Sequence, residues 1–267
     1  MNKRGRILQG RAVCFFLIPL LMLTAVSVWA DHHVPDSESP VSGELGPDFM
    51  GRFAIIADVG DWNPLLELDG RIEGSDRELR YRALTAGTYY RPHRNLKIGS
   101  FYRVQAGARH DDDWQREGMD DWAWKESGDR YEHLLLLDAT PRFLLGRSGV
   151  ASAKLRYEHN LSNAQQVLLL GPGYTWFYMT DREPRWNLSL NYSLYFSLNF
   201  GDMPIYRHGP YASLLIHLSE LLKMELRGEY QTSIWSTSED SEETGDSYVK
   251  FDRRVLLGLG FVLTPRF

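Results

Sequence analysis

Two short stretches of the sequence contain residue types that could do catalytic chemistry, and one holds a histidine and a serine. His159 and Ser162 lie in the sequence HNLSN at positions 159–163. An imidazole within reach of a hydroxyl group can accept its proton and turn the oxygen into a nucleophile. In an extended strand, residues three apart lie on opposite faces, so this pair meets only where a β-bulge intervenes. A hairpin loop is the simpler interpretation.

The other stretch is acidic. It reads RHDDDW from position 109 and continues as DDWAW at 120–124, and its candidate functional residues are Asp111 and Asp113. Clustered carboxylates can bind a divalent cation or activate a water molecule as a general base. A solvated acidic loop is the simpler interpretation here too, as it is for the charge run at 236–246. Phosphate-loop, zinc and redox motifs do not occur in the sequence.

The elements that would position these residues show a period of two. Between Arg185 and Phe200 the chain reads RWNLSLNYSLYFSLNF, in which large apolar residues alternate with Asn, Ser and Tyr. In 222–236 the apolar set alternates with charges of both signs, KMELRGE. A period of two places the two sets on opposite faces of a strand. We therefore expect Leu194 to face lipid and Ser193 to face a polar lumen.

Segments with this pattern recur from Asp48 onward and predict about ten strands, an even number that is typical of bacterial single-chain barrels. They are longer than the five or six residues usual for strands of globular sheets. The expected strands cover 48–60, 77–91, 95–108, 130–143, 149–160, 165–179, 185–200, 207–218, 222–236 and 247–267.

The connections between these strands are sorted by length. Short polar turns at 91–95, around Arg147, at 180–184 and at 219–221 alternate with five others, of which 61–76, 109–129 and 237–246 are long and acidic. All long loops therefore fall at one end of the sheet. Outer-membrane barrels show this asymmetry, with short periplasmic turns and longer external loops.

The polar faces of the predicted strands collect fourteen basic and eight acidic side chains. One interpretation is a salt-bridge network that fills the interior and fixes the strand register, because barrels of about eight strands are filled by side chains. The other is a narrow pore whose basic excess favours anionic solutes. The residues expected to point into the lumen include Arg80, Arg82, Arg103, Arg156, Glu158, Glu225, Arg227, Glu229 and Arg254.

The N-terminal thirty residues are expected to be a signal peptide. A basic start, MNKRGR, precedes an apolar run that ends in Val28-Trp29-Ala30, which predicts cleavage before Asp31; an uncleaved anchor is the alternative. Removal of the four basic residues in this segment changes the formal net charge from −5 to −9, which disfavours nucleic-acid binding. Cys14 is the only cysteine, so the mature chain would have no thiol. Residues 31–47 are expected to form a disordered lead.

With these features the chain resembles the outer-membrane β-barrel proteins of Gram-negative bacteria, and more loosely the small uncharacterised ten-stranded barrels among them. The resemblance covers 48–267 and includes the C-terminal Phe267, preceded by apolar residues at alternate positions. It implies that Phe267 is the signal read by the barrel-assembly machinery. Pro265 departs from the pattern, which usually has an aromatic or aliphatic residue there. Such a resemblance implies no activity.

Two enzyme families of the outer membrane are faintly similar. Omptin proteases use an Asp pair that faces an Asp-His pair, which the Asp111/Asp113 pair resembles, but no Asp-Xaa-His partner occurs in a second loop. Lipid A deacylases and outer-membrane phospholipases carry His-Xaa-Ser-Asn on a strand. In this chain His159 and Ser162 are one residue further apart than in that motif.

The sequence thus predicts an all-β fold: a transmembrane antiparallel up-and-down β-barrel of about ten strands in the outer membrane, with both termini periplasmic. The expected function is non-enzymatic, either structural or as a narrow solute channel with a basic-biased lumen. The alternatives are an enzyme acting on lipid or peptide at the external rim, or a surface adhesin or receptor. Expected partners are outer-membrane lipid, lipopolysaccharide, the barrel-assembly machinery and a divalent cation at the acidic loops. Nucleic acid and cofactors are not expected.

Overall fold

The computed structural model describes residues 47–73, 78–108, 114–117, 121–124, 130–181, 183–201, 203–236 and 249–266. The predicted signal peptide, nearly all of the predicted lead, Asp111, Asp113 and Phe267 lie outside the described residues. Nowhere in the described part of the chain does a helix reach the length and hydrophobicity needed to cross a bilayer.

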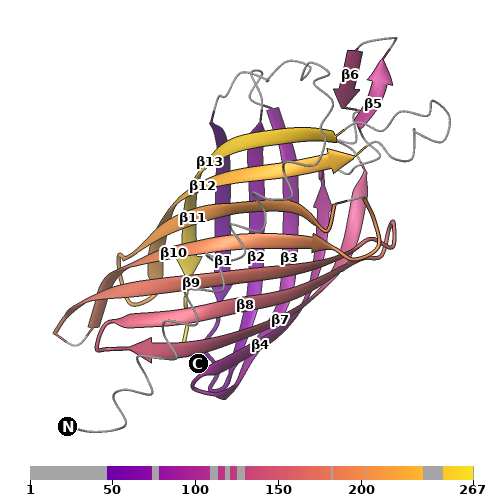
Figure 1. Ribbon diagram of the computed structural model, residues 1–267. Coiled ribbons are helices and arrows are strands. Elements are labelled where there is room, and N and C mark those ends of the chain that lie inside the picture. The colour runs from indigo at the N-terminus through magenta and orange to yellow at the C-terminus, as the bar shows by residue number, and fades with distance from the viewer. Residues whose placement is uncertain are drawn as a thin grey trace, which may run out of the picture. The chain divides into compact units, whose positions relative to one another are not determined.

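Eleven strands form a closed barrel in the order β1-β13-β12-β11-β10-β9-β8-β7-β4-β3-β2 (Figure 1). Two further short strands, β5 (Trp114–Glu117) and β6 (Asp121–Trp124), pair separately. The barrel strands are β1 (Asp48–Ile56), β2 (Trp62–Glu73), β3 (Glu78–His93), β4 (Leu96–Ala106), β7 (Tyr131–Leu145), β8 (Gly149–Asn160), β9 (Gln166–Thr180), β10 (Glu183–Ser197), β11 (Ile205–His217), β12 (Leu222–Ser236) and β13 (Val249–Leu263).

The barrel has one strand more than expected, and the additional strand is β2. The sequence reasoning assigned 61–76 to a long acidic loop, and that prediction is wrong. The acidic residues of β2 alternate with apolar ones: Glu67 is buried inside the barrel, while Leu66 and Leu68 are exposed on the outer face. The negative charges of Glu67 and Asp69 therefore belong to an inner wall and not to a solvated loop.

An odd number of strands changes how the barrel closes. Each strand is antiparallel to its neighbours except at the closure, where β1 pairs with β13 in parallel and Phe53 lies opposite Phe261. The first strand consequently begins at one end of the barrel and the last strand finishes at the other. The expectation that both barrel termini lie on the same side is therefore wrong.

The two longest connections of the barrel lie at the same end. One end of the barrel, called here the short-turn end, joins strands through 57–61, 94–95, 146–148, 181–182 and 218–221. Gly60, Gly146 and Asp181 have positive φ in three of these turns, a backbone conformation that turns of types II, I′ and II′ require. The opposite long-loop end carries the 107–130 and 237–248 connections.

Apolar side chains lie mainly on the outside of the barrel. Among the described residues, thirty-one large hydrophobic side chains are exposed, whereas fifteen hydrophobic residues are buried. In β10, Leu190 on the outer face is 54% exposed, although Leu194 on the same face is buried. Asn191 and Ser193 line the interior, as the alternation predicts. The arrangement is the reverse of a water-soluble domain, whose large apolar groups mostly lie inside.

A smaller apolar cluster lies inside the barrel. It lies against the half of the wall that runs from β13 through β1 to β7, and Phe101 contacts the ring of Tyr89 edge-on at 4.6 Å. Gly87 lies beside Phe101, and a Cβ atom at Gly87 would approach that ring to 2.6 Å. The cluster consists of Ala54, Leu65, Phe101, Leu134, Leu136 and Val262, with Ile56 and Tyr89 packed against it.

The parallel closure predicts which cysteine pairs can be cross-linked. The pairs Phe49→Cys/Leu257→Cys and Phe53→Cys/Phe261→Cys should both form disulfides on mild oxidation, because each pair is directly opposed in the β1–β13 register. Reducing and non-reducing gels of the folded protein would measure the yield. The crossed pairs Phe49→Cys/Phe261→Cys and Phe53→Cys/Leu257→Cys are the controls. An antiparallel closure would cross-link the crossed pairs instead.

Candidate binding cavity

The interior of the barrel contains a cavity of about 530 Å³, to which all eleven barrel strands contribute. This volume lies within the range of small-molecule binding sites. Tyrosine, serine and asparagine side chains supply neutral polar groups to the wall. The charged lining residues are Arg52, Arg71, Arg103, Lys154, Arg156, Arg207, Arg227 and Arg254, with Glu67, Asp69, Glu158, Glu225 and Asp252.

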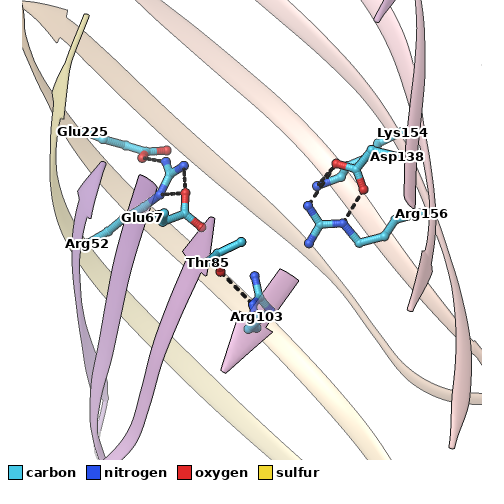
Figure 2. Close-up of polar contacts among 8 residues, drawn as sticks. All are labelled: Arg52, Glu67, Thr85, Arg103, Asp138, Lys154, Arg156 and Glu225. Atoms are coloured by element: carbon cyan, nitrogen blue, oxygen red, sulfur yellow. Dashed lines mark hydrogen bonds and ion pairs between the residues drawn. The ribbon is translucent and has the colours of Figure 1, made fainter. Parts of the chain in front are cut away.

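Arg52 of β1 holds three strands together (Figure 2). Its Nη1 donates to Oε2 of Glu225 on β12 at 2.7 Å, and its Nε donates to Oε2 of Glu67 on β2 at 2.9 Å. The contact with β12 reaches across β13, at the position of Gly260, which is opposite both Arg52 and Glu225. Because Gly260 has no side chain, the guanidinium group can pass over the intervening strand.

Asp138 of β7 is the centre of a second cluster (Figure 2). Its side chain is only 1% exposed. Arg156 of β8 donates to its two carboxylate oxygens from Nε at 2.5 Å and from Nη2 at 3.0 Å, a bidentate pair. Lys154 Nζ lies 3.6 Å from the same carboxylate, and Glu158 lies 3.6 Å from Arg156. This cluster joins β7 to β8.

The remaining ion pairs of the described interior also run along the wall. Arg227 donates to Glu229 at 2.7 Å within β12, and Arg254 donates to Asp252 at 2.7 Å within β13. Arg254 also lies 3.7 Å from Asp48 on the neighbouring β1. Each pair joins residues of one strand, of adjacent strands or, for Arg52, of strands separated by one. The ion pairs therefore stabilise the wall without filling the cavity.

Most of the residues expected in the lumen are placed in this cavity. Arg103, Arg156, Glu158, Glu225, Arg227 and Arg254 line it, and Glu229 bonds to Arg227.

The prediction that Arg80 and Arg82 point into the lumen is wrong. The β2–β3 register shifts between Arg71 and Ile72, so Arg80 occupies a bulge and does not line the cavity. Arg82 lies on the outer face, with its guanidinium carbon 5.6 Å from the centre of the Tyr131 ring. Tyr81 lines the cavity instead, because the bulge changes which residues point inward.

The candidate catalytic pair is not assembled. Ser162 Oγ accepts a hydrogen bond from the backbone N–H of His133 at 3.1 Å. His159 lies beside the ring of Tyr157, with centroids 6.5 Å apart. No hydrogen bond joins His159 to Ser162 in the described chain, and Asp111 and Asp113 lie outside it. Within the described ranges, no group of three or more His, Cys, Asp or Glu side chains could hold a metal ion.

Several cavity residues were missed by the sequence reasoning. Glu67, Asp69 and Arg71 were assigned to a loop, although their alternation with Leu66, Leu68 and Ile72 is the signal that could have found them. Tyr81 and Tyr211 carry no clear sequence signal, because tyrosine is compatible with an apolar or a polar environment. Both line the cavity.

Comparison of this chain with known proteins identifies no relative. The chain matches no protein-family model, and the searches of curated proteins and of solved structures give no significant match.

The buried Asp138 carboxylate predicts a large effect at Arg156. Arg156→Ala should lower the free energy of unfolding by about 3 kcal/mol, because it leaves a buried carboxylate without its bidentate partner. Urea unfolding in detergent micelles, followed by tryptophan fluorescence, would measure the change. The control is Arg91→Ala, which breaks the exposed 2.8 Å pair with Asp58 and should cost less than about 1 kcal/mol. Equal losses would contradict the assignment of Asp138 and Arg156 as a buried structural pair.

Proposed function

We propose that this protein is a non-enzymatic outer-membrane β-barrel that acts as a narrow channel favouring small anionic solutes. The observation that carries the proposal is the polarity of the closed sheet, which has an apolar outer wall and a charged inner wall around a cavity. A closed sheet leaves no unpaired strand edge, which is the condition for spanning lipid with strands.

The outer wall supports a membrane location. Exposed apolar side chains surround the barrel on strands as different as β2, β7, β10 and β13, with Leu68, Leu137, Leu190 and Leu257 as examples. A contiguous apolar surface of this extent would drive aggregation in water. β10 alone has 15 residues, more than the nine to eleven that a tilted transmembrane strand needs.

Aromatic side chains mark both ends of the outer wall. At the short-turn end Trp62 lies beside Tyr90, with ring centroids 4.7 Å apart, and Trp186 contacts Trp176 at 5.0 Å.

Towards the long-loop end the outer wall carries pairs of tyrosine and histidine. Tyr102 and His133 share a 2.5 Å hydrogen bond, and Tyr192 and His208 share one of 2.8 Å. Such side chains, apolar at one end and polar at the other, suit the two membrane–water interfaces.

The arrangement of the inner wall favours the channel interpretation over that of a filled structural barrel. The ion pairs lie along the wall and leave a cavity of about 530 Å³ unfilled, which disfavours the interpretation that salt bridges plug the interior. Eight basic and five acidic side chains line the cavity, and this basic excess favours anions over cations. No comparable observation supports the enzyme alternative, because Ser162 is bonded to backbone and not to His159.

The connections between strands suggest which end of the proposed barrel faces the periplasm. In outer-membrane barrels the longer loops are external and the short turns periplasmic. In the proposed arrangement the last strand therefore ends on the periplasmic side, where Phe267 would be available to the barrel-assembly machinery. The signal peptide, lipopolysaccharide and a divalent cation at the acidic loops belong to the same proposal.

A charge on the outer wall should oppose insertion. Leu190→Arg should cost on the order of 2–4 kcal/mol if this residue lies near the bilayer midplane. Ser189→Arg, one residue away, should have a much smaller effect because Ser189 faces the polar cavity. The folded fraction in phosphatidylcholine vesicles can be measured by the mobility shift on gels with and without boiling. Similar losses for both variants would contradict the proposed lipid-facing wall.

Conductance tests the channel itself. The purified barrel in a planar bilayer should give small, steady single-channel currents, and a potassium chloride gradient should give a reversal potential of the sign for chloride selectivity. Folded protein without conductance would contradict the channel and leave a structural barrel. A reversal potential of the sign for potassium selectivity would contradict the anion preference.

A further inference from the structure

Arg103 and Arg207 differ from five of the other basic side chains that line the cavity. Arg52, Lys154, Arg156, Arg227 and Arg254 each lie within ion-pair distance of a carboxylate. Arg103 and Arg207 have no such carboxylate among the residues that the structure describes. These two guanidinium groups therefore carry positive charge that no fixed ion pair neutralises.

Arg207 of β11 is held by aromatic rings. Its guanidinium carbon lies 5.4 Å from the ring centre of Tyr195 on β10 and 5.3 Å from that of Tyr206. A register shift between β10 and β11 beside Tyr195 accompanies this arrangement, and both tyrosines and Arg207 line the cavity. Stacking on aromatic faces fixes the guanidinium plane while leaving its N–H groups available.

The Nε atom of Arg207 is buried and has no hydrogen-bond partner within the described chain. A buried donor without a partner is costly, and the cost is larger for a charged group. An oxyanion in the cavity cannot reach this buried atom, but the two Nη atoms of Arg207 are not buried in this way and make no hydrogen bond to a described residue. These unused Nη donors, on a side chain with no carboxylate partner, point to an anionic ligand.

Arg103 of β4 is oriented in a different way. Its Nε donates to Oγ1 of Thr85 at 2.9 Å (Figure 2), and its other N–H groups make no hydrogen bond to a described residue. Thr85 is a neutral partner on the adjacent β3, so it positions the guanidinium group without neutralising it. Arg103 thus presents unused donors to the cavity that it lines.

The two arginines come from opposite sides of the barrel. Between β4 and β11 lie four strands in one direction and five in the other, close to half of the circumference. Both side chains line the same cavity. They therefore present positive charge to it from facing walls.

We propose that Arg103 and Arg207 form a two-armed binding site for a small organic dianion, with one carboxylate or phosphate group at each guanidinium. Asn191, Ser193 and Tyr195 of β10 line the cavity and supply hydrogen-bonding groups for the middle of such a solute. The site deepens the proposed channel and rests on it in one respect, that solutes reach the cavity. Glu158 lines the same cavity and carries negative charge, so it should repel the anionic ligand and weaken its binding.

Binding to the refolded full chain in detergent micelles tests the site. Isothermal titration with succinate should show saturable binding at low ionic strength. Inorganic phosphate has one anionic group and not two, so tighter binding of phosphate than of succinate would contradict the two-armed site. Arg103→Gln and Arg207→Gln should each weaken binding at least tenfold. Arg207→Lys should weaken it less, because it keeps the charge and loses the planar donor set. Glu158→Gln should strengthen binding several-fold.

Arg254→Gln is the matched control, because Arg254 lines the same cavity but is paired with Asp252. It should change the affinity less than twofold, and the boiling-dependent gel shift would verify that every variant is folded. Absence of saturable binding in the wild type, or equal losses in Arg254→Gln and Arg207→Gln, would overturn the site. Conductance without saturable binding would retain the channel and overturn the site. Binding without conductance would retain the site and overturn the channel.

Discussion

The parallel pairing of β1 with β13 is the contact on which the rest of the structure depends. A closed sheet has no strand edge with unpaired backbone donors and acceptors, and this seam is where the eleven strands close. The register of the seam also places Gly260 between Arg52 and Glu225. Closure and the polar interior are thus coupled, since the ion pair that joins β1 to β12 exists only in this register.

Ion pairing inside the barrel has two effects on the cavity. It neutralises most of the cavity arginines, and it draws their long side chains onto the wall, as Arg156 is drawn to Asp138 and Arg227 to Glu229. The first effect reduces the net field, and the second leaves open volume. If the barrel is the proposed channel, its selectivity would depend less on total charge than on cations such as Arg103 and Arg207, which have no ion-pair partner among the described residues.

Much of this fold is predictable from alternation, because a period of two identifies both the strands and their inner faces. Ten of the eleven strands, and the inward positions of residues such as Arg103 and Arg227, follow from it. β2 was missed because Glu67 and Asp69 made its inner face look like an acidic loop. The bulge at Arg80 was missed because one extra residue reverses the faces without altering the composition. The pairing of Arg52 with Glu225 has no local sequence signal, because it depends on the register of two other strand pairs.

The size of the barrel explains why so few residues can decide its behaviour. Eleven strands lie closer to the eight that side chains fill than to the sixteen of wide porins. In so narrow an interior, side chains on facing walls, such as Arg103 of β4 and Arg207 of β11, border the same cavity. In the proposed site, a solute would meet both arginines at once. Two facing cations with unused donors can then discriminate between anions by shape, which a diffuse positive potential cannot do.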